Sequence, residues 1–263
     1  MIYLINYANK PYAKMQKFQS YTAKNFGGID KIIEYSDSDI YRDKTFYLNN
    51  KKILDIKKGN GLFLWKPYII LKTLQKLGKD DILIYCDVDT IFIDDVKPLT
   101  QLMKKKKSSL MVFDSPNFEY EYTKYNLCQD LGLLENSILE SRQRYASYSL
   151  YRKTKYTLGF IQEWLNTCTI YDHISDEVKS YHPTYGQKFV HNLQDQSIFS
   201  LLTKKHRIEA FRDPSNWGNN FKKEYGNSFY DQLLYNGVAE SRKLWLMTYL
   251  FGKAYLTKKF KRD

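Results

Sequence analysis

The stretch that most constrains the fold of this chain is ILIYCDVDTIFID, residues 82–94. It opens with consecutive apolar and aromatic residues, which predict a short strand that crosses the core. Two carboxylates follow, Asp87 and Asp89, and because they are two positions apart they point to the same side of an extended chain. Ligands of open parallel sheets bind beyond the carboxyl ends of the strands, so both side chains are predicted to face one ligand.

The segments before this strand alternate between strand and helix patterns. They predict, in order, strand 2–7, helix 12–25, strand 31–35 with a polar turn at 36–39, and helix 62–77. Gly78 closes the last of these helices. This order is typical of an α/β domain with a mostly parallel central sheet flanked by helices.

The later part of the chain continues the same alternation less regularly. Helices are predicted at 96–106, 154–168 and 195–202, and strands at 109–113, 145–151 and 208–212. Asp94 and Asp95 are expected to cap the first of these helices. Residues 172–192 lack periodicity and contain three of the four histidines, which makes this segment a candidate functional loop.

Length and composition suit one large globular domain or a domain with a subdomain. The chain has 263 residues, of which 43% are hydrophobic, but no stretch approaches the roughly 20 apolar residues of a membrane-spanning helix. The N-terminus lacks a signal-peptide pattern, so a cytosolic protein is expected. Three cysteines without CxxC spacing, Cys86, Cys128 and Cys168, are predicted to be buried thiols rather than a disulfide framework or a zinc site.

The net charge of +12 is concentrated at the C-terminal end. Residues 241–263 contain seven basic residues and one acid, interleaved with aromatic and aliphatic side chains. This pattern is typical of an interfacial amphipathic helix on an anionic membrane, but a terminal helix packed on the domain has the same composition. We therefore divide the chain into a domain, residues 1–240, and a helical basic aromatic tail, residues 241–263.

The carboxylate pair itself has two chemical interpretations. Two hard anionic oxygens suit Mg²⁺ or Mn²⁺, with further ligands from a diphosphate, and the metal then neutralises charge that develops on a nucleoside diphosphate leaving group. The letters of residues 82–90 also fit a haloacid-dehalogenase-type phosphatase motif, in which Asp87 is the nucleophile and Asp89 the acid/base. That family needs a later acidic pair for Mg²⁺, and none follows residue 95 in its usual context.

Residues 65–99, WKPYIILKTLQKLGKDDILIYCDVDTIFIDDVKPL, carry a family resemblance. They resemble the D-x-D block of nucleotide-sugar-dependent glycosyltransferases with the GT-A fold, a Rossmann-like arrangement. The similarity is greatest to bacterial lipopolysaccharide and capsule glycosyltransferases and looser to the glycogenin-like family. Residues 194–202, QDQSIFSLL, are similar to an Asp-Gln motif that these relatives place beside the donor sugar.

The resemblance implies roles for residues of this chain. Asp87 and Asp89 are the expected ligands of the metal and the diphosphate. Asp195 and Gln196 are the expected catalytic residues near the anomeric carbon, with Asp195 as general base if the enzyme inverts, and with either residue stabilising an oxocarbenium-like sugar if it retains. Donor contacts are expected from the end of the first strand and from the start of the helix before the motif: Asn6, Tyr7, Ala8, Trp65 and Lys66.

The chain also departs from the glycogenin-like pattern. That family supplies a late histidine motif as third metal ligand, and no such motif follows His206. His191 and His206 are therefore only candidates for the third ligand. A surface histidine without a metal is the alternative for both.

These observations together predict a metal-dependent glycosyltransferase. The expected donor is a UDP-sugar, the cofactor Mn²⁺ or Mg²⁺, and the acceptor a glycan or lipid-linked glycan of the cell surface, reached from the inner face of the membrane. The alternatives are the phosphatase and a basic nucleic-acid- or membrane-binding protein without chemistry. No nucleic-acid partner is expected, because no recognised binding motif accompanies the charge.

Overall fold

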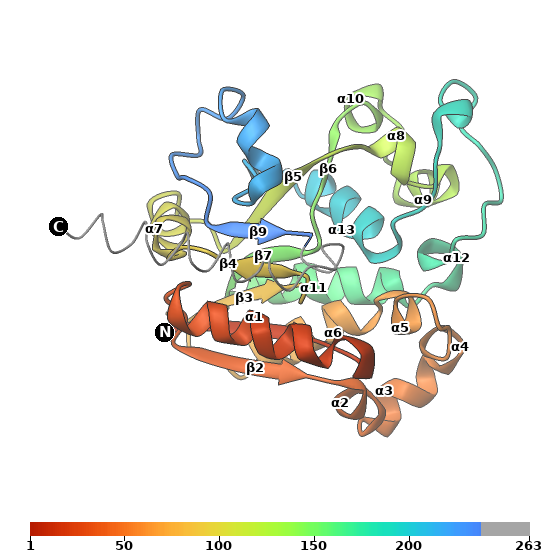
Figure 1. Ribbon diagram of the computed structural model, residues 1–263. Helices are drawn as coiled ribbons and strands as arrows, with labels where there is room; N and C mark the ends of the chain where they lie inside the picture. The colour runs from red at the N-terminus through yellow and green to blue at the C-terminus, as the bar shows by residue number, and fades with distance from the viewer. Residues whose placement is uncertain (238–263) are drawn as a thin grey trace.

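The computed structural model describes residues 1–237 as an α/β domain around a mixed seven-stranded sheet (Figure 1). The strand order is β2-β1-β3-β7-β5-β6, and β8 pairs with β5. The bounds of these strands are β1 (Ile2–Tyr7), β2 (Lys31–Tyr35), β3 (Ile82–Cys86), β5 (Leu110–Phe118), β6 (Arg142–Arg144), β7 (Tyr148–Arg152) and β8 (Ala210–Phe211). A small second sheet pairs β4 (Thr90–Phe92) with β9 (Leu234–Asn236).

Most strands of the large sheet run in one direction. β1 is parallel to β2 and β3, and β5 is parallel to β8, whereas β7 is antiparallel to its neighbours β3 and β5 and β6 is antiparallel to β5. Strands β1, β2, β3, β5 and β8 therefore share a direction that β6 and β7 oppose. The predicted fold class, α/β with a mostly parallel central sheet, is confirmed.

Helices cover both faces of the sheet, and the central strand is buried on each side. Leu83 and Tyr85 of β3 pack into one core cluster, and Ile82, Ile84 and Cys86 pack into the other. The longer helices are α1 (Ala13–Asn25), α6 (Trp65–Leu74), α7 (Lys97–Lys105), α11 (Lys155–Cys168) and α13 (Gln194–Lys205). Contacts join α11 to both α6 and α13, so these three helices form one layer.

Short helices occupy most of the connections. They are α2 (Asp37–Tyr41), α3 (Lys44–Asn49), α4 (Lys51–Leu54), α5 (Gly59–Leu62), α8 (Glu119–Tyr122), α9 (Tyr125–Leu131), α10 (Asn136–Leu139) and α12 (Tyr171–Ile174). Single 3₁₀ turns are η1 (Lys10–Tyr12), η2 (Gly186–Lys188) and η3 (Asn216–Phe221). None of the helices within residues 1–237 is long and apolar enough to cross a membrane.

Several sequence-based expectations need correction. Residues 36–39 are not a plain turn: Ser36 and Asp39 form a capping box that begins α2. The helix expected from residue 62 begins at Trp65, because residues 59–63 all have positive φ angles, between 51° and 95°. The strand expected to end at residue 113 continues to Phe118.

The expectation for the three cysteines is confirmed, since they are buried and free. The expected capping of α7 by Asp94 and Asp95 is not: the N-cap residue is Val96, although Asp95 accepts a hydrogen bond from the N–H of Lys97, and Asp94 accepts the N–H of Asp95. The tail, residues 241–263, lies outside the described residues, so the division into domain and tail stays a prediction.

Candidate active site

The turn that carries the two carboxylates is fixed from both sides. Asp87 follows β3 directly, and its N–H donates to the carbonyl of Ser147, which precedes β7, at 2.7 Å. On the other side, the amide of Gln19 on α1 donates to the carbonyls of Asp87 and Thr90. The turn is therefore held rigidly at the carboxyl end of the central strand, where ligands of this kind of sheet bind.

A cleft of about 470 Å³ opens beside this turn. Such a volume suits a nucleotide-sized ligand. Its walls are Tyr7, Ala8, Asn9, Tyr12, Lys57, Gly59, Asn60, Phe63, Trp65, Asp87, Val88 and Asp89. The cleft thus brings together the acid pair and most residues that the sequence assigned to the donor.

Aromatic residues with polar partners also line the cleft. Trp65 stacks on Tyr7, with ring centroids 3.8 Å apart, and its indole N–H donates to the carbonyl of Gly59 at 3.0 Å. The Tyr7 hydroxyl donates to Asp37, whose carboxylate also accepts from the Asn60 amide at 2.8 Å. Burial and the Asp37 charge raise the pKa of the Tyr7 phenol, so it stays a hydrogen-bond donor at neutral pH.

Asn60 reaches the cleft because the backbone around it is left-handed. Residues 59–63 form a left-handed turn, a conformation that costs about 1–3 kcal/mol for each residue other than glycine. Gly59 and Gly61 adopt it without strain, and Asn tolerates it better than most residues. Such strain is characteristic of ligand-binding segments, and this turn supplies Gly59, Asn60 and Phe63 to the cleft.

Lys66 links the two carboxylates that the sequence assigned to separate roles. Its ammonium group lies 3.1 Å from Asp195 and 3.5 Å from Asp87. The residue is only 3% exposed. Burial acts to lower the pKa of Lys66, but the two carboxylates raise it above its ordinary value, so the side chain is a cation.

Asp195 is as buried as Lys66. It is 3% exposed, and its Oδ2 has no hydrogen bond, although the ion pair with Lys66 reaches that atom. Burial raises the pKa of Asp195 to about 6, against the opposing effect of Lys66. Its side chain does not line the cleft, so the geometry favours a role through Lys66 over direct proton abstraction from an acceptor.

The acid pair has the chemistry of a cation site. Burial, and then the charge of Asp87, raise the pKa of Asp89 to about 6. Two carboxylates that repel each other beside a cleft favour a divalent cation, and their oxygens match Mg²⁺ or Mn²⁺. Within residues 1–237 no group of three His, Cys, Asp or Glu side chains is arranged to hold a metal.

Gln196 lies beside the same turn. Its Oε1 accepts the N–H of Ala146 at 3.3 Å, and Ala146 adjoins Ser147, whose carbonyl binds the Asp87 N–H. Its Nε2 donates to Gln143 at 3.0 Å. The predicted pair Asp195 and Gln196 thus reaches the D-x-D turn by two routes, through Lys66 and through Ala146.

Some predicted site residues lie elsewhere. The side chain of Asn6 is fully buried and bonded to Gln16, Gln19 and Ser20, so it supports the D-x-D turn through Gln19. It does not line the cleft, whereas the next residues, Tyr7 and Ala8, both do, so the predicted donor contact of Asn6 gains no support from the cleft.

The two histidine candidates have other neighbours. His206 follows the far end of α13, about 16 Å along the helix from Asp195, and pairs with Glu163 at 2.7 Å. His191 is exposed and lies edge-on to the Tyr122 ring. Neither side chain lines the cleft. Among the residues that the structure describes, the cleft therefore supports neither histidine as a third metal ligand.

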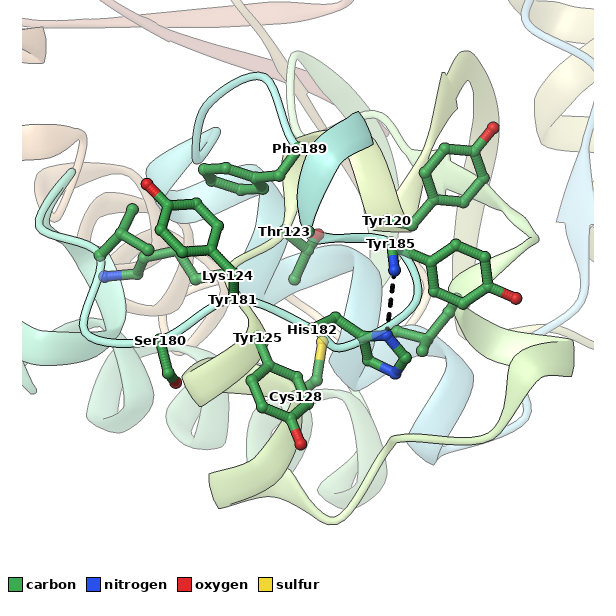
Figure 2. Close-up of a pocket in the computed structure, with 13 residues that line it drawn as sticks. Tyr120, Thr123, Lys124, Tyr125, Cys128, Ser180, Tyr181, His182, Tyr185 and Phe189 are labelled. Atoms are coloured by element: carbon green, nitrogen blue, oxygen red, sulfur yellow. Dashed lines mark hydrogen bonds between the residues drawn. The ribbon is translucent and has the colours of Figure 1, made fainter.

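The loop at 172–192 borders a second, small cavity. Figure 2 shows this cavity, between residues 120–128 and the loop, in which the N–H of Tyr185 donates to His182. Aromatic rings surround it, but its volume of about 20 Å³ leaves room for a water molecule and not for a sugar. The prediction that this loop is functional gains no support from the cavity.

Sequence reasoning missed two polar residues of the site, one at the start of α2 and one in the turn before α6. Asp37 and Asn60 were not singled out, because they lie in short polar segments without periodicity. The Gly-Asn-Gly sequence at 59–61 was the available signal, since glycines that flank an Asn indicate a left-handed backbone.

Comparisons with known proteins agree with the fold. No protein-family model matches the sequence, and neither does any curated protein sequence. Among solved structures, the apo form of mouse xyloside xylosyltransferase 1 is similar over 92% of this chain and 100% of its own, with a TM-score of 0.51 and 10% sequence identity. The galactosyltransferase LgtC, in complex with donor and acceptor sugar analogues, is similar over 89% and 86%, with a TM-score of 0.47 and 13% identity.

Proposed function

We propose that this protein is a metal-dependent glycosyltransferase that moves a sugar from a nucleoside diphosphate to a glycan or lipid-linked acceptor. The observation that carries the proposal is the cleft at the end of β3, which Asp87 and Asp89 line together with Tyr7 and Trp65, while Lys66 lies 3.5 Å from Asp87. The fold supports it, since one similar structure, which spans nearly the whole chain, is that of a xylosyltransferase.

In this proposal the acid pair holds Mn²⁺ or Mg²⁺ together with the donor diphosphate. A divalent cation at this place supplies positive charge against the negative charge that the leaving diphosphate develops. Asp87 and Asp89 provide the protein's oxygen ligands, and Lys66 adds a fixed cation beside them. Because Lys66 is buried and tied to Asp195, its charge is oriented before the substrate arrives.

The aromatic residues of the cleft would bind the base and ribose. Tyr7 and Trp65 offer stacked, largely apolar rings, and Asp37 and Asn60 provide a polar edge at one side. We take UDP as the nucleotide from the family resemblance. Asn60 and Asp37 form a donor–acceptor pair of the kind that recognises a base or a ribose hydroxyl.

The cell-surface acceptor and the membrane contact belong to the same proposal. They rest on the resemblance to lipopolysaccharide and capsule enzymes and on the basic aromatic composition of residues 241–263. Removal of these residues is expected to weaken flotation with anionic liposomes, and unchanged flotation would separate the tail from any membrane role.

The catalytic proposal is tested by turnover. The purified protein is incubated with a panel of nucleoside diphosphate sugars and MnCl₂, and release of free nucleoside diphosphate is followed with and without EDTA. Metal-dependent hydrolysis of at least one donor is expected, because such transferases pass the sugar slowly to water when the acceptor is absent. Release of inorganic phosphate from phosphate monoesters instead would support the phosphatase alternative.

A further inference from the structure

A second concentration of positive charge lies in the short helices before α6 and in α6 itself. Residues 42–79 contain ten basic and two acidic residues. Figure 1 shows α2, α3 and α4 together at one corner of the molecule, outside the large sheet. An excess of positive charge on one folded segment attracts anions. Of the ten basic residues, the proposed chemistry uses Lys66 alone.

Part of this charge surrounds a hollow of about 480 Å³ beside α2 and α3. Four of its lining residues are cations and two are acids. The lining residues are Tyr35, Asp39, Arg42, Asp43, Lys44, Lys72 and Lys76. Lys72 lies 3.6 Å from Asp43, whereas Arg42, Lys44 and Lys76 have no carboxylate partner within residues 1–237.

The two acids of the hollow are bonded to neighbouring groups of the protein. Oδ2 of Asp39 accepts the N–H and the hydroxyl of Ser36 in the capping box of α2, both at 2.8 Å. Oδ1 of Asp43 accepts the N–H of Phe46 at 3.1 Å, and its Oδ2 accepts the hydroxyl of Tyr68. These bonds hold the acids in the local structure, so a net positive charge remains around the hollow.

Exposed apolar groups accompany this charge. Leu48 is 65% exposed, and it follows Lys44 by one helical turn, so both side chains lie on the same face of α3. Phe46, two positions from each, faces the opposite way, and its ring stacks on that of Tyr68 with centroids 3.8 Å apart. Tyr41, at the end of α2, is 43% exposed. Apolar and aromatic side chains among cations are typical of a surface that enters the headgroup region of a membrane.

We propose that the basic surface formed by Tyr41, Arg42, Lys44, Leu48 and Lys76 docks on an anionic lipid membrane. The three cations contact headgroup phosphates, and Leu48 enters the boundary between headgroups and acyl chains. These residues lie in a different part of the chain from residues 241–263, on which the proposed membrane contact rests. The docking goes beyond the proposed function, because it requires no glycosyl transfer.

The basic surface borders the candidate active site. Asp37, at the start of α2, accepts from the amide of Asn60, which lines the cleft. Arg42 follows Asp37 along the same helix by about 7.5 Å. A membrane on the basic surface therefore lies beside the cleft, within reach of a lipid-linked acceptor. Only this last step rests on the proposed function.

Vesicle binding tests the docking. The full-length wild type and the triple variant Arg42→Gln/Lys44→Gln/Lys76→Gln are sedimented with phosphatidylcholine vesicles that contain or lack phosphatidylglycerol. The three residues are exposed, so the variant should fold as the wild type does. The wild type should bind only the vesicles that contain phosphatidylglycerol. The triple variant should bind them about 100-fold more weakly, since each Lys or Arg near an anionic surface contributes about fivefold.

The matched control removes the same charge from another surface. Lys104→Gln/Lys105→Gln/Lys107→Gln alters three exposed lysines at the end of α7, which Figure 1 shows at the opposite side of the molecule from α3. This control should bind within about threefold of the wild type, because charges more than about 8 Å from the lipid are screened. Equal losses in the two triple variants would overturn the inference, since binding would then follow net charge.

A further variant leaves the charge unchanged. Leu48→Ser removes the side chain that enters the membrane and should weaken binding about 10-fold. Leu134→Ser, at an exposed leucine before α10, is its control and should bind as the wild type does. Wild-type binding by both the Arg42/Lys44/Lys76 variant and Leu48→Ser would remove the basic surface from any membrane contact.

The remaining outcomes separate this inference from its alternatives. A single-stranded oligonucleotide is tested in place of the vesicles, and loss of its binding in the triple variant with vesicle binding unchanged would assign the surface to nucleic acid. That result would overturn the inference. Donor turnover in solution should be equal in the wild type and the triple variant. A protein without donor turnover that still loses vesicle binding in the triple variant would contradict the proposed function and support the docking.

Discussion

Two buried lysine–acid pairs lie on the same layer of helices, and they differ in how completely their charges are satisfied. In the pair Lys204–Glu119, both carboxylate oxygens have hydrogen-bond partners and one cation meets one acid. In the pair Lys66–Asp195, one cation is shared between two acids, with Asp195 Oδ2 at 3.1 Å and Asp87 at 3.5 Å. We call the first the closed pair, and we call the second, together with Asp87, the open site, because Asp87 lines the cleft.

The pKa directions follow the same difference. Burial lowers the pKa of Lys204, and Glu119 offsets this only in part. Burial also acts on Lys66, but two carboxylates outweigh it and raise the pKa. A surplus of negative charge thus remains around Lys66, Asp87 and Asp89. A surplus of negative charge favours the binding of a cation, whereas a balanced ion pair favours a purely structural role.

The largest expected effect is the loss of an acid from the open site. Asp87→Asn removes a metal ligand and should lower donor turnover about 10³-fold, roughly 4 kcal/mol, because neutralisation of the leaving group is the main electrostatic task. Initial rates at saturating Mn²⁺ measure it. Asp80→Asn, an exposed acid in the turn before β3, is the matched control and should keep full activity. Turnover within threefold of the wild type in Asp87→Asn would remove Asp87 from the mechanism.

The second-largest effect is expected from removal of the cation of the closed pair, Lys204. Lys204→Met leaves Glu119 charged and buried, which should lower the free energy of unfolding by about 3–5 kcal/mol. Urea unfolding followed by circular dichroism measures it. The neighbouring Lys205 pairs with Glu163 at the surface, so Lys205→Met should cost no more than about 1 kcal/mol. Equal midpoints for both variants would contradict the structural role assigned to the closed pair.

A smaller effect is expected from pH. The pKa of Asp89 is raised to about 6, so its proton persists well above the ordinary range of a carboxyl group and competes with the metal. Affinity for Mn²⁺ and UDP together should be constant above pH 6 and fall up to tenfold per unit below it. The same raised pKa makes the unfolding free energy of the free protein decrease as pH rises from about 4 to 6. Calorimetric titrations between pH 5 and 8 measure the affinity, and an increase towards pH 5 would contradict the assignment.

The smallest effect concerns the polar edge of the cleft. Asn60→Ala removes the amide that meets Asp37 and should weaken UDP binding about 5-fold, near 1 kcal/mol, which is usual for one hydrogen bond. Asn60→Gly, which keeps the left-handed turn without strain, separates the side chain from the backbone. If Asn60→Gly binds UDP as the wild type does, the amide makes no contact with the nucleotide.

The sequence predicted those parts of the fold that local pattern determines. β1, β2 and β3 are runs of apolar β-formers, and each was placed at its observed bounds. The short helices α2 to α5 were missed, because segments of four to six residues carry no hydrophobic period. β5 was cut short at Phe113, since its last residues are polar or proline and look like a loop.

The two acids of the candidate site could be predicted from the sequence, but the ion pairs and hydrogen bonds that join them to the rest of the protein could not. Asp87 and Asp89 follow from one strand, but the ion pair of Lys66 with Asp195 joins residues that are far apart in the chain. The burial of this ion pair has no local sequence signal, and neither has the hydrogen bond that Gln196 donates to Gln143. Both depend on how α6, α13 and β6 pack together. The left-handed turn before α6 did have a local signal, the sequence Gly-Asn-Gly at 59–61.

The central claim is that Asp87 and Asp89 bind a divalent cation together with a nucleoside diphosphate. Isothermal titration of the protein with UDP, in MnCl₂ and then in EDTA, tests it most directly. We predict binding in MnCl₂ that is lost in EDTA and lost in Asp89→Asn, while Asp80→Asn binds as the wild type does. UDP binding of equal strength in MnCl₂, in EDTA and in Asp89→Asn would contradict the account.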